Sequence, residues 1–161
     1  MSGPAATLAD AALADLDAVM AVMDDSFDPR FGEAWTAGQC AGLLPMPGVW
    51  LTLARDPTGG EAIGFALARA VAGEAELLLL AVRSTVQGRG IGKMLLDRFE
   101  GEASARGARR LHLEVREGNH ALRLYERAGY ALVGRRRNYY SGHGGTTFDA
   151  LTLAKTAGNP R

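Results

Sequence analysis

The 161-residue chain contains a single cysteine, Cys40, and so cannot form an internal disulfide bond. No apolar run approaches the roughly 20 residues that a membrane-spanning helix needs. The segment from Met1 to Ala6 has no basic group ahead of an apolar stretch, so we expect no secretory signal peptide. These absences predict a cytoplasmic protein, in which Cys40 is a packed side chain rather than a nucleophile.

Net charge is also missing, because 18 Lys and Arg residues balance 18 Asp and Glu residues. A chain without excess charge gains no bulk attraction to nucleic acid or to a membrane, so we expect neither as a partner. The length favours one domain, residues 1–161, although the small, polar or Pro- and Gly-rich ends, 1–6 and 156–161, are expected to be loose. The sequence leaves the oligomeric state open.

Hydrophobic periodicity predicts a mixed α/β protein. Helices are expected at about 11–26, at 33–44 with a weaker pattern, from Ile91 to a cap at Gly107, and at 121–128. Strands are expected at 49–54, 62–70, 75–82, 111–116, 130–137 and 146–153, with a flexible hairpin tip at 141–145. This order predicts a central mixed sheet with helices on both faces.

A glycine-rich stretch, Gln87-Gly-Arg-Gly-Ile-Gly92, separates the apolar run 77–82 from the helix that follows. Glycine lets the backbone approach a ligand closely, and the free N–H groups at the start of a helix favour an anion such as phosphate. A nucleoside triphosphate loop needs a hydroxyl residue where Met94 stands. A dinucleotide loop needs a different glycine spacing and an acidic residue about 20 positions later.

The order Gln87, Gly90 and Gly92 is similar to the Gln/Arg-x-x-Gly-x-Gly/Ala signature of the GNAT N-acetyltransferases. Residues 75–154 resemble the ribosomal-protein alanine N-acetyltransferases of this superfamily through Leu80-Ala-Val82, Leu113-Glu-Val-Arg116, Asn119, Leu124-Tyr125, Ala128-Gly-Tyr130 and Arg137-Asn-Tyr-Tyr140. The segment from Asn119 to Tyr125 is one residue shorter than is usual there. The resemblance implies the GNAT fold, with the loop for acetyl-coenzyme A between its fourth strand and third helix.

The resemblance also implies which residues hold acetyl-coenzyme A. The backbone of a strand edge would pair with the pantetheine arm, and the loop amides would hold the pyrophosphate. The residues predicted to bind the coenzyme are Leu80, Ala81, Val82, Gln87, Gly88, Arg89, Gly90, Ile91, Gly92, Lys93 and Asn119. We predict no metal.

Two side chains are implied as catalytic: Glu114 as the base that accepts the proton of the amine, and Tyr125 as the acid that donates to the departing sulfur. Each has a structural alternative, because Glu114 could simply pair with Arg116 or Arg110, and Tyr125 could be a core residue. His112, which lies on the same strand face as Glu114, is a competing base. Asn119 could equally cap a short helix.

The main functional hypothesis is an acetyl-coenzyme A-dependent N-acetyltransferase acting on a protein N-terminal amine, with a ribosomal-protein alanine as first candidate. The alternatives are a GNAT enzyme for a small amine, an antibiotic or a lysine side chain, and a non-catalytic regulator that binds acyl-coenzyme A. A peptide acceptor favours an open groove beside the sheet, whereas a small amine favours a closed one.

Overall fold

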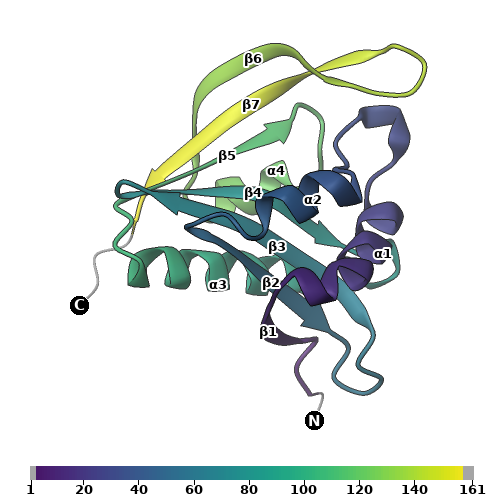
Figure 1. The fold of residues 1–161 in the computed structure, drawn as a ribbon. Helices are drawn as coiled ribbons and strands as arrows, with labels where there is room; N and C mark the ends of the chain where they lie inside the picture. Colours follow the sequence, from purple (N-terminus) through teal and green to yellow (C-terminus); the bar gives the residue numbers. More distant parts are fainter. Residues whose placement is uncertain (1–2, 158–161) are drawn as a thin grey trace.

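The computed structural model describes residues 3–157 and contains one seven-stranded sheet with helices against both faces (Figure 1). The strand order is β1-β2-β3-β4-β5-β7-β6, and β4–β5 is a parallel pair among antiparallel ones. The strands are β1 (Thr7–Ala11), β2 (Val49–Arg55), β3 (Ala62–Val71), β4 (Glu74–Val82), β5 (Arg110–Arg116), β6 (Ala131–Ser141) and β7 (Thr147–Thr156). The α-helices are α1 (Leu16–Ser26), α2 (Ala37–Leu43), α3 (Ile91–Ala105) and α4 (Leu122–Arg127), with 3-10 turns η1 (Leu13–Asp15), η2 (Pro29–Phe31) and η3 (Ser84–Val86).

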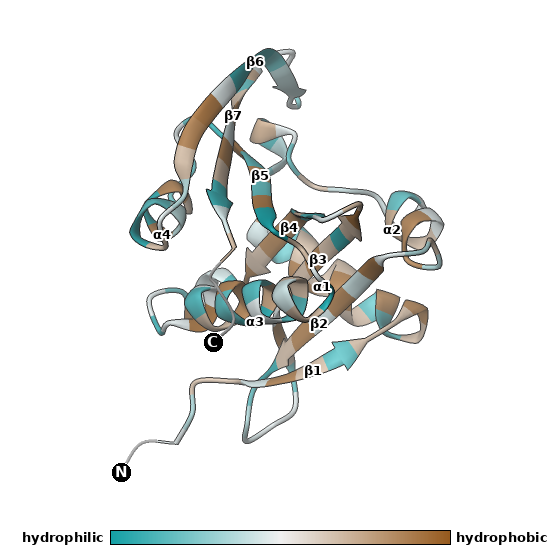
Figure 2. Ribbon diagram, turned by 90° about the vertical axis from the view of Figure 1, so that its left-hand side faces the viewer, coloured by the Kyte–Doolittle hydropathy of each residue, from teal (hydrophilic) through white to brown (hydrophobic). Residues whose placement is uncertain are grey.

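The core lies in two layers, one on each side of the sheet. On one side α3 packs against the sheet, where Phe99 stacks on Trp50 with ring centroids 5.9 Å apart. On the other side α1 and α2 cover Phe65 and Leu67 of β3, with Met23 fully buried between them. Figure 2 shows hydrophobic residues running along the central strands between these helices. The mixed α/β arrangement with helices on both faces is therefore confirmed.

The N-terminal region differs from the sequence prediction. Residues 7–11 form the edge strand β1, and the first α-helix begins at Leu16 rather than near residue 11. An edge strand buries little of its surface, so its apolar alternation is weak and was hidden by the following helical pattern.

The ends of the chain were predicted to be loose, but Ala6 is 2% exposed and Thr156 pairs with Arg110, so these two residues are held in place. The rest of the predicted loose ends lies partly outside the described residues.

The parallel strands β4 and β5 pair only along the first half of β4. Their register runs from Glu74 opposite Arg110 to Leu77 opposite Leu113. The pairing of β4 with β3 shifts at the same place, because Leu67 lies opposite Leu79 whereas Ala68 lies opposite Leu77. An extra residue of this kind bends a strand. The ends of β4 and β5 therefore diverge, and the site occupies the gap between them.

Candidate active site

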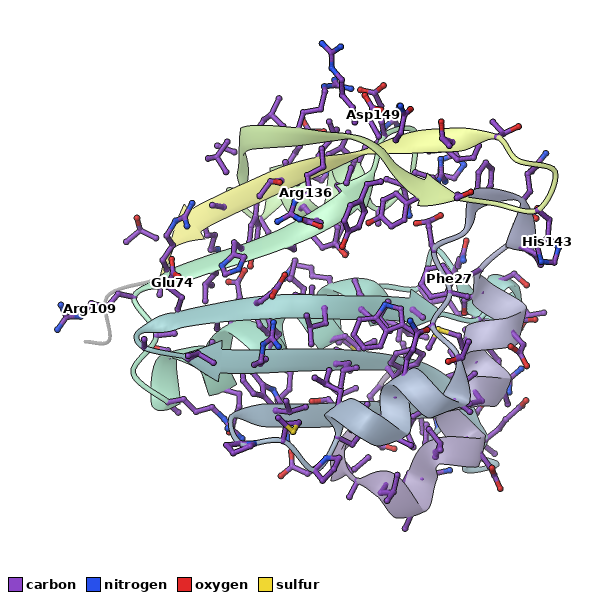
Figure 3. The ribbon with its side chains drawn as sticks, turned by 45° about the horizontal axis from the view of Figure 1, so that its top comes forward. Phe27, Glu74, Arg109, Arg136, His143 and Asp149 are labelled. Carbon is purple, nitrogen blue, oxygen red and sulfur yellow. The ribbon has the colours of Figure 1, made fainter. Side chains whose placement is uncertain are left out.

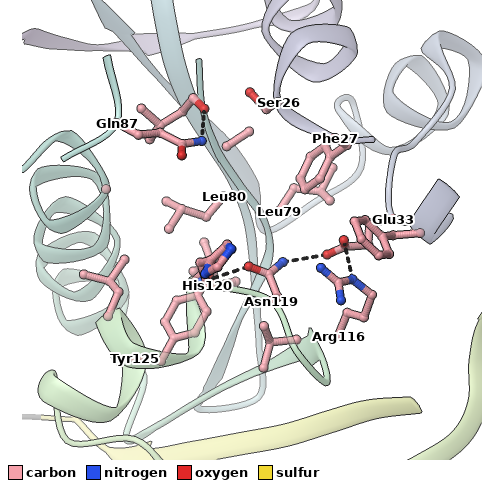
Figure 4. Close-up of a pocket in the computed structure, with 18 of the residues that line it drawn as sticks. Ser26, Phe27, Glu33, Leu79, Leu80, Gln87, Arg116, Asn119, His120 and Tyr125 are labelled. Atoms are coloured by element: carbon pink, nitrogen blue, oxygen red, sulfur yellow. Dashed lines mark hydrogen bonds and ion pairs between the residues drawn. The ribbon is translucent and has the colours of Figure 1, made fainter. Parts of the chain in front are cut away.

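A cavity of about 570 Å³ fills the gap between β4 and β5. This lies in the ~300–1,000 Å³ range of small-molecule pockets. Its walls come from the far half of β4, the glycine loop, the end of β5, the start of α4, the loop after α1 and the hairpin of β6 and β7. Segments from both halves of the chain therefore meet at one place (Figure 4).

The glycine loop forms an open cradle at the start of α3. Gly88 and Gly90 have φ angles of 82° and 83°, a left-handed conformation that favours glycine. A Cβ at either residue would meet no heavy atom within 4 Å, so the space above the loop is open. The first turn of α3 carries no side-chain cap and no acidic residue. The free N–H groups there can bind an anion, which fits the phosphates of acetyl-coenzyme A.

Most of the residues predicted to bind the coenzyme line the cavity: Leu80, Ala81, Val82, Gln87, Gly88, Gly90, Ile91, Gly92 and Asn119. Beyond Leu77, the edge of β4 that faces β5 has no ladder partner among residues 3–157, which leaves backbone groups free for an extended ligand. The Gln87 side chain donates to the Val82 carbonyl at 3.2 Å and so ties the loop to the strand. Arg89 and Lys93 do not line the cavity, and Lys93 instead pairs with Asp97 at 2.8 Å.

Glu114 lines the cavity on the side of β5, with its side chain only 15% exposed. Its carboxylate forms an ion pair with Nε of Arg136 at 2.6 Å, and neither of the two expected partners binds it. Arg110 pairs with Glu74 at 3.1 Å, and Arg116 pairs with Glu33. The pairing with Arg136 leaves Glu114 facing the cavity, where a carboxylate can receive a proton.

The competing base His112 does not line the cavity. Its Nε2 lies 3.9 Å from the Glu76 carboxylate on the neighbouring strand, and its Nδ1 is buried without a hydrogen-bond partner. Of the two candidate bases, Glu114 alone faces the cavity.

Tyr125 is 5% exposed and projects from α4 toward the cavity (Figure 4). Burial, followed by the nearby Tyr140 and the Glu33 carboxylate, raises the pKa of the Tyr125 phenol well above its usual value. The phenol therefore keeps its proton throughout the neutral range and remains a hydrogen-bond donor. The structural alternative also holds in part, because its ring packs edge-to-face against Tyr130 at 6.0 Å.

Glu33, in the loop between α1 and α2, is a site residue that the sequence prediction missed. Its carboxylate accepts from Nε of Arg116 and from Nδ2 of Asn119, each at 2.7 Å. The Asn119 side chain also accepts from the N–H of Ala121 at 2.8 Å. Ala121 is the N-cap residue of α4 and no side chain among residues 3–157 caps this helix, so Asn119 fixes the turn before α4 rather than capping the helix itself. Glu33 and Arg116 lie 83 positions apart in the sequence, and no local pattern indicates their pairing.

The sheet, the anion cradle at a helix start and the facing carboxylate and phenol are the features that a transferase for a phosphate-bearing acyl donor would need. The chain belongs to the acetyltransferase (GNAT) family, whose profile matches residues 16–130. Members of this family use acetyl-coenzyme A. Within residues 3–157, no group of three His, Cys, Asp or Glu side chains is placed to hold a metal ion, and no helix is long and apolar enough to span a membrane.

Two curated relatives carry names that describe N-terminal acetylation. The chain is 40% identical over 94 residues to a ribosomal protein bS18-alanine N-acetyltransferase of Haemophilus influenzae, a match that covers 58% of this chain and 64% of the relative. It is 39% identical over 108 residues to N-alpha-acetyltransferase RimI of Mycobacterium tuberculosis, covering 64% and 65%. These matches span just under two thirds of each relative's length.

Among solved structures, the chain superimposes on the ribosomal-protein-S18-alanine N-acetyltransferase from Escherichia coli with a TM-score of 0.82. The two sequences are 28% identical, and the alignment covers 97% of this chain and 96% of that one. The fold thus agrees over nearly the whole length of both chains.

Proposed function

We propose that the protein is an acetyl-coenzyme A-dependent N-acetyltransferase whose acceptor is a protein N-terminal amine, with the alanine of a ribosomal protein as the first candidate. One observation carries the proposal: Glu114 and Tyr125 face the same cavity as the glycine cradle. The names of the two relatives support this choice of acceptor. We place the reaction in the cytoplasm, where ribosomal proteins and acetyl-coenzyme A are found.

The residues divide the chemistry between them. Acetyl-coenzyme A supplies the acetyl group as a thioester, which an amine can attack directly. The glycine cradle holds the phosphates, and the free edge of β4 orients the arm that leads to the thioester. Glu114 takes the proton of the amine, directly or through a water molecule. Tyr125 keeps a proton on Oη at the cavity wall, ready for the departing sulfur.

An N-terminal amine is the acceptor that needs the least help from Glu114 to lose its proton. An α-amino group titrates at about 7.7–8.0, whereas a lysine side chain titrates at about 10.4. The N-terminal amine therefore loses its proton more readily at neutral pH. Glu114, which is paired with Arg136, therefore has to remove a proton from a less basic amine when the acceptor is an N-terminus than when it is a lysine.

A small amine is the second candidate, and one contact favours it. The tip of the β6–β7 hairpin touches the loop after α1, where the N–H of His143 donates to the Pro29 carbonyl at 3.1 Å. Figure 3 shows His143 at this tip, on the same side of the molecule as Phe27 at the end of α1. A Cβ on Gly142 would collide with the backbone of Arg30. This contact joins the hairpin to the loop after α1, and such a closed arrangement favours a small amine over a long peptide.

The deciding assay measures the release of free thiol from acetyl-coenzyme A with a panel of acceptors. The panel contains a peptide that starts with alanine, an N-terminally blocked twin that contains lysine, and spermidine. We expect the free N-terminal peptide to give the highest rate. Faster reaction of spermidine would indicate a small-amine acceptor, and faster reaction of the blocked peptide would indicate a lysine side chain. Binding of acetyl-coenzyme A without turnover of any acceptor would indicate a regulator.

A further inference from the structure

Arg116 is the one charged residue among residues 3–157 that is buried, with 8% of its surface exposed. Its guanidinium lies 3.8 Å from the centre of the Phe31 ring and 5.7 Å from that of Phe148. It also donates to Glu33 at 2.7 Å and to the Glu117 carbonyl at 3.1 Å. Arginine is rarely buried unless it is fully paired. The burial of this charge at the cavity wall indicates that its contacts have a role in the site.

The contacts of Arg116 hold together parts of the site that are distant in sequence. Phe31 and Glu33 belong to the loop between α1 and α2, and Phe148 belongs to β7. The two phenylalanine rings also touch edge-to-face at 5.3 Å. The end of β5 is thus joined to the loop and to the hairpin through one side chain. These segments surround the half of the cavity that lies away from the glycine cradle.

The same network reaches the helix that carries Tyr125. The second oxygen of Glu33 accepts from Asn119, whose own side-chain oxygen accepts from the N–H of Ala121 just before α4. Tyr125 follows one turn later and lines the cavity. Displacement of Glu33 would therefore move both the acceptor wall and the start of α4. Figure 4 shows Arg116, Glu33 and Asn119 as a connected row beside Tyr125.

We propose that Arg116 is the positioning residue of the acceptor side. It holds Glu33 and Phe31 so that the loop after α1 forms a fixed wall, and through Asn119 it sets the start of the helix bearing Tyr125. Arg116 acts through these neighbours and takes no part in proton transfer. This inference rests on the proposed acetyltransferase function.

The test compares Arg116→Lys and Glu33→Gln with the parent protein. Lysine keeps the charge but lacks the planar fork that binds Glu33 and stacks on Phe31. Glutamine keeps the shape of Glu33 but removes the charge that balances Arg116. Small displacements of a reacting group can lower rates by about 10²-fold. We expect Arg116→Lys to lower kcat/KM for an alanine-starting peptide by about that factor, and Glu33→Gln by roughly 10-fold.

Binding of acetyl-coenzyme A separates positioning from general damage. Isothermal calorimetry should give a Kd for acetyl-coenzyme A within about threefold of the parent in both variants, because neither side chain touches the glycine cradle. Arg135→Lys is the matched control, since Arg135 lies on β6, is 41% exposed and pairs with Glu117 and Asp149 without lining the cavity. It should keep the parental turnover. If Arg116→Lys fails to fold, Glu33→Gln carries the same test.

Two results would overturn the inference. One is peptide turnover by both folded variants at the parental level. The other is an equal loss of acetyl-coenzyme A affinity and of turnover, which would indicate damage to the whole site. A parent protein that acetylates no amine at all would instead contradict the proposed function itself.

Discussion

The two sides of the cavity are built in different ways. The proposed coenzyme side is nearly continuous in sequence, because residues 80–92 run from the free edge of β4 through the loop into the first turn of α3. The proposed acceptor side is assembled from separate segments, namely Glu33, Glu114, Tyr125 and Tyr140. The coenzyme side depends on backbone geometry, whereas the acceptor side depends on side-chain pairing. Substitutions on the two sides should therefore change different measured quantities.

The largest effect is expected from Glu114→Gln, on turnover alone. Loss of a positioned base typically lowers a rate by about 10²–10⁴-fold, and the glycine cradle does not touch this residue. Steady-state kinetics with an alanine-starting peptide and calorimetry with acetyl-coenzyme A would measure the two effects. Glu117→Gln, at an exposed carboxylate on the same segment, is the control. A Glu114→Gln enzyme within about twofold of the parent from about pH 6 to about pH 9 would reject the assignment of Glu114 as the base.

Gly90→Asp should instead lower the affinity for acetyl-coenzyme A. It places a Cβ and a negative charge at the cradle, at a residue with a left-handed φ of 83°. Because a hydrogen bond to a charged group contributes about 1.5–3 kcal/mol, we expect acetyl-coenzyme A to bind roughly 10- to 100-fold more weakly. Gly101→Asp adds the same charge to an open position on α3 and is the matched control. Equal affinities for the two variants would place the phosphates elsewhere.

Tyr125→Phe should give the smallest kinetic effect, about 10-fold on kcat, because a thiol that titrates near 8.5 needs only one hydrogen bond to leave. Burial raises the pKa of this phenol, so the parent should show no loss of activity from its ionisation as pH rises toward about 10. A pH–rate profile of the two proteins measures this. An activity of Tyr125→Phe equal to that of the parent would leave Tyr125 as a core residue.

The raised pKa of Tyr125 also has a consequence for stability. Above about pH 10 the unfolded chain loses the phenol proton while the folded protein keeps it, so stability falls as pH rises through that value. Tyr125→Phe removes this contribution. The Tm of the parent should therefore fall more steeply than that of the variant between about pH 9 and about pH 11. Parallel curves would show that the phenol ionises equally in both states.

The sequence prediction succeeded where the information was local. The glycine loop, the start of α3 and the cap at Gly107, with a φ of 85°, follow from backbone rules that act over a few residues. Glu114 was predicted from Leu113-Glu-Val-Arg116 and lines the cavity, while its catalytic role stays a prediction. Its partner Arg136 was not predicted, because that pairing depends on the register of β5, β7 and β6. Glu33 was missed for the same reason. Its role comes from two partners more than 80 residues away.

The most direct test of the proposed function uses one peptide that carries both a free N-terminal alanine and an internal lysine. The two amines then compete within a single molecule at equal concentration. Fragmentation mass spectrometry after partial reaction with acetyl-coenzyme A identifies which nitrogen is modified. We expect the acetyl group on the α-amine of the alanine. An acetyl group mainly on the lysine side chain, or none on either nitrogen, would contradict it.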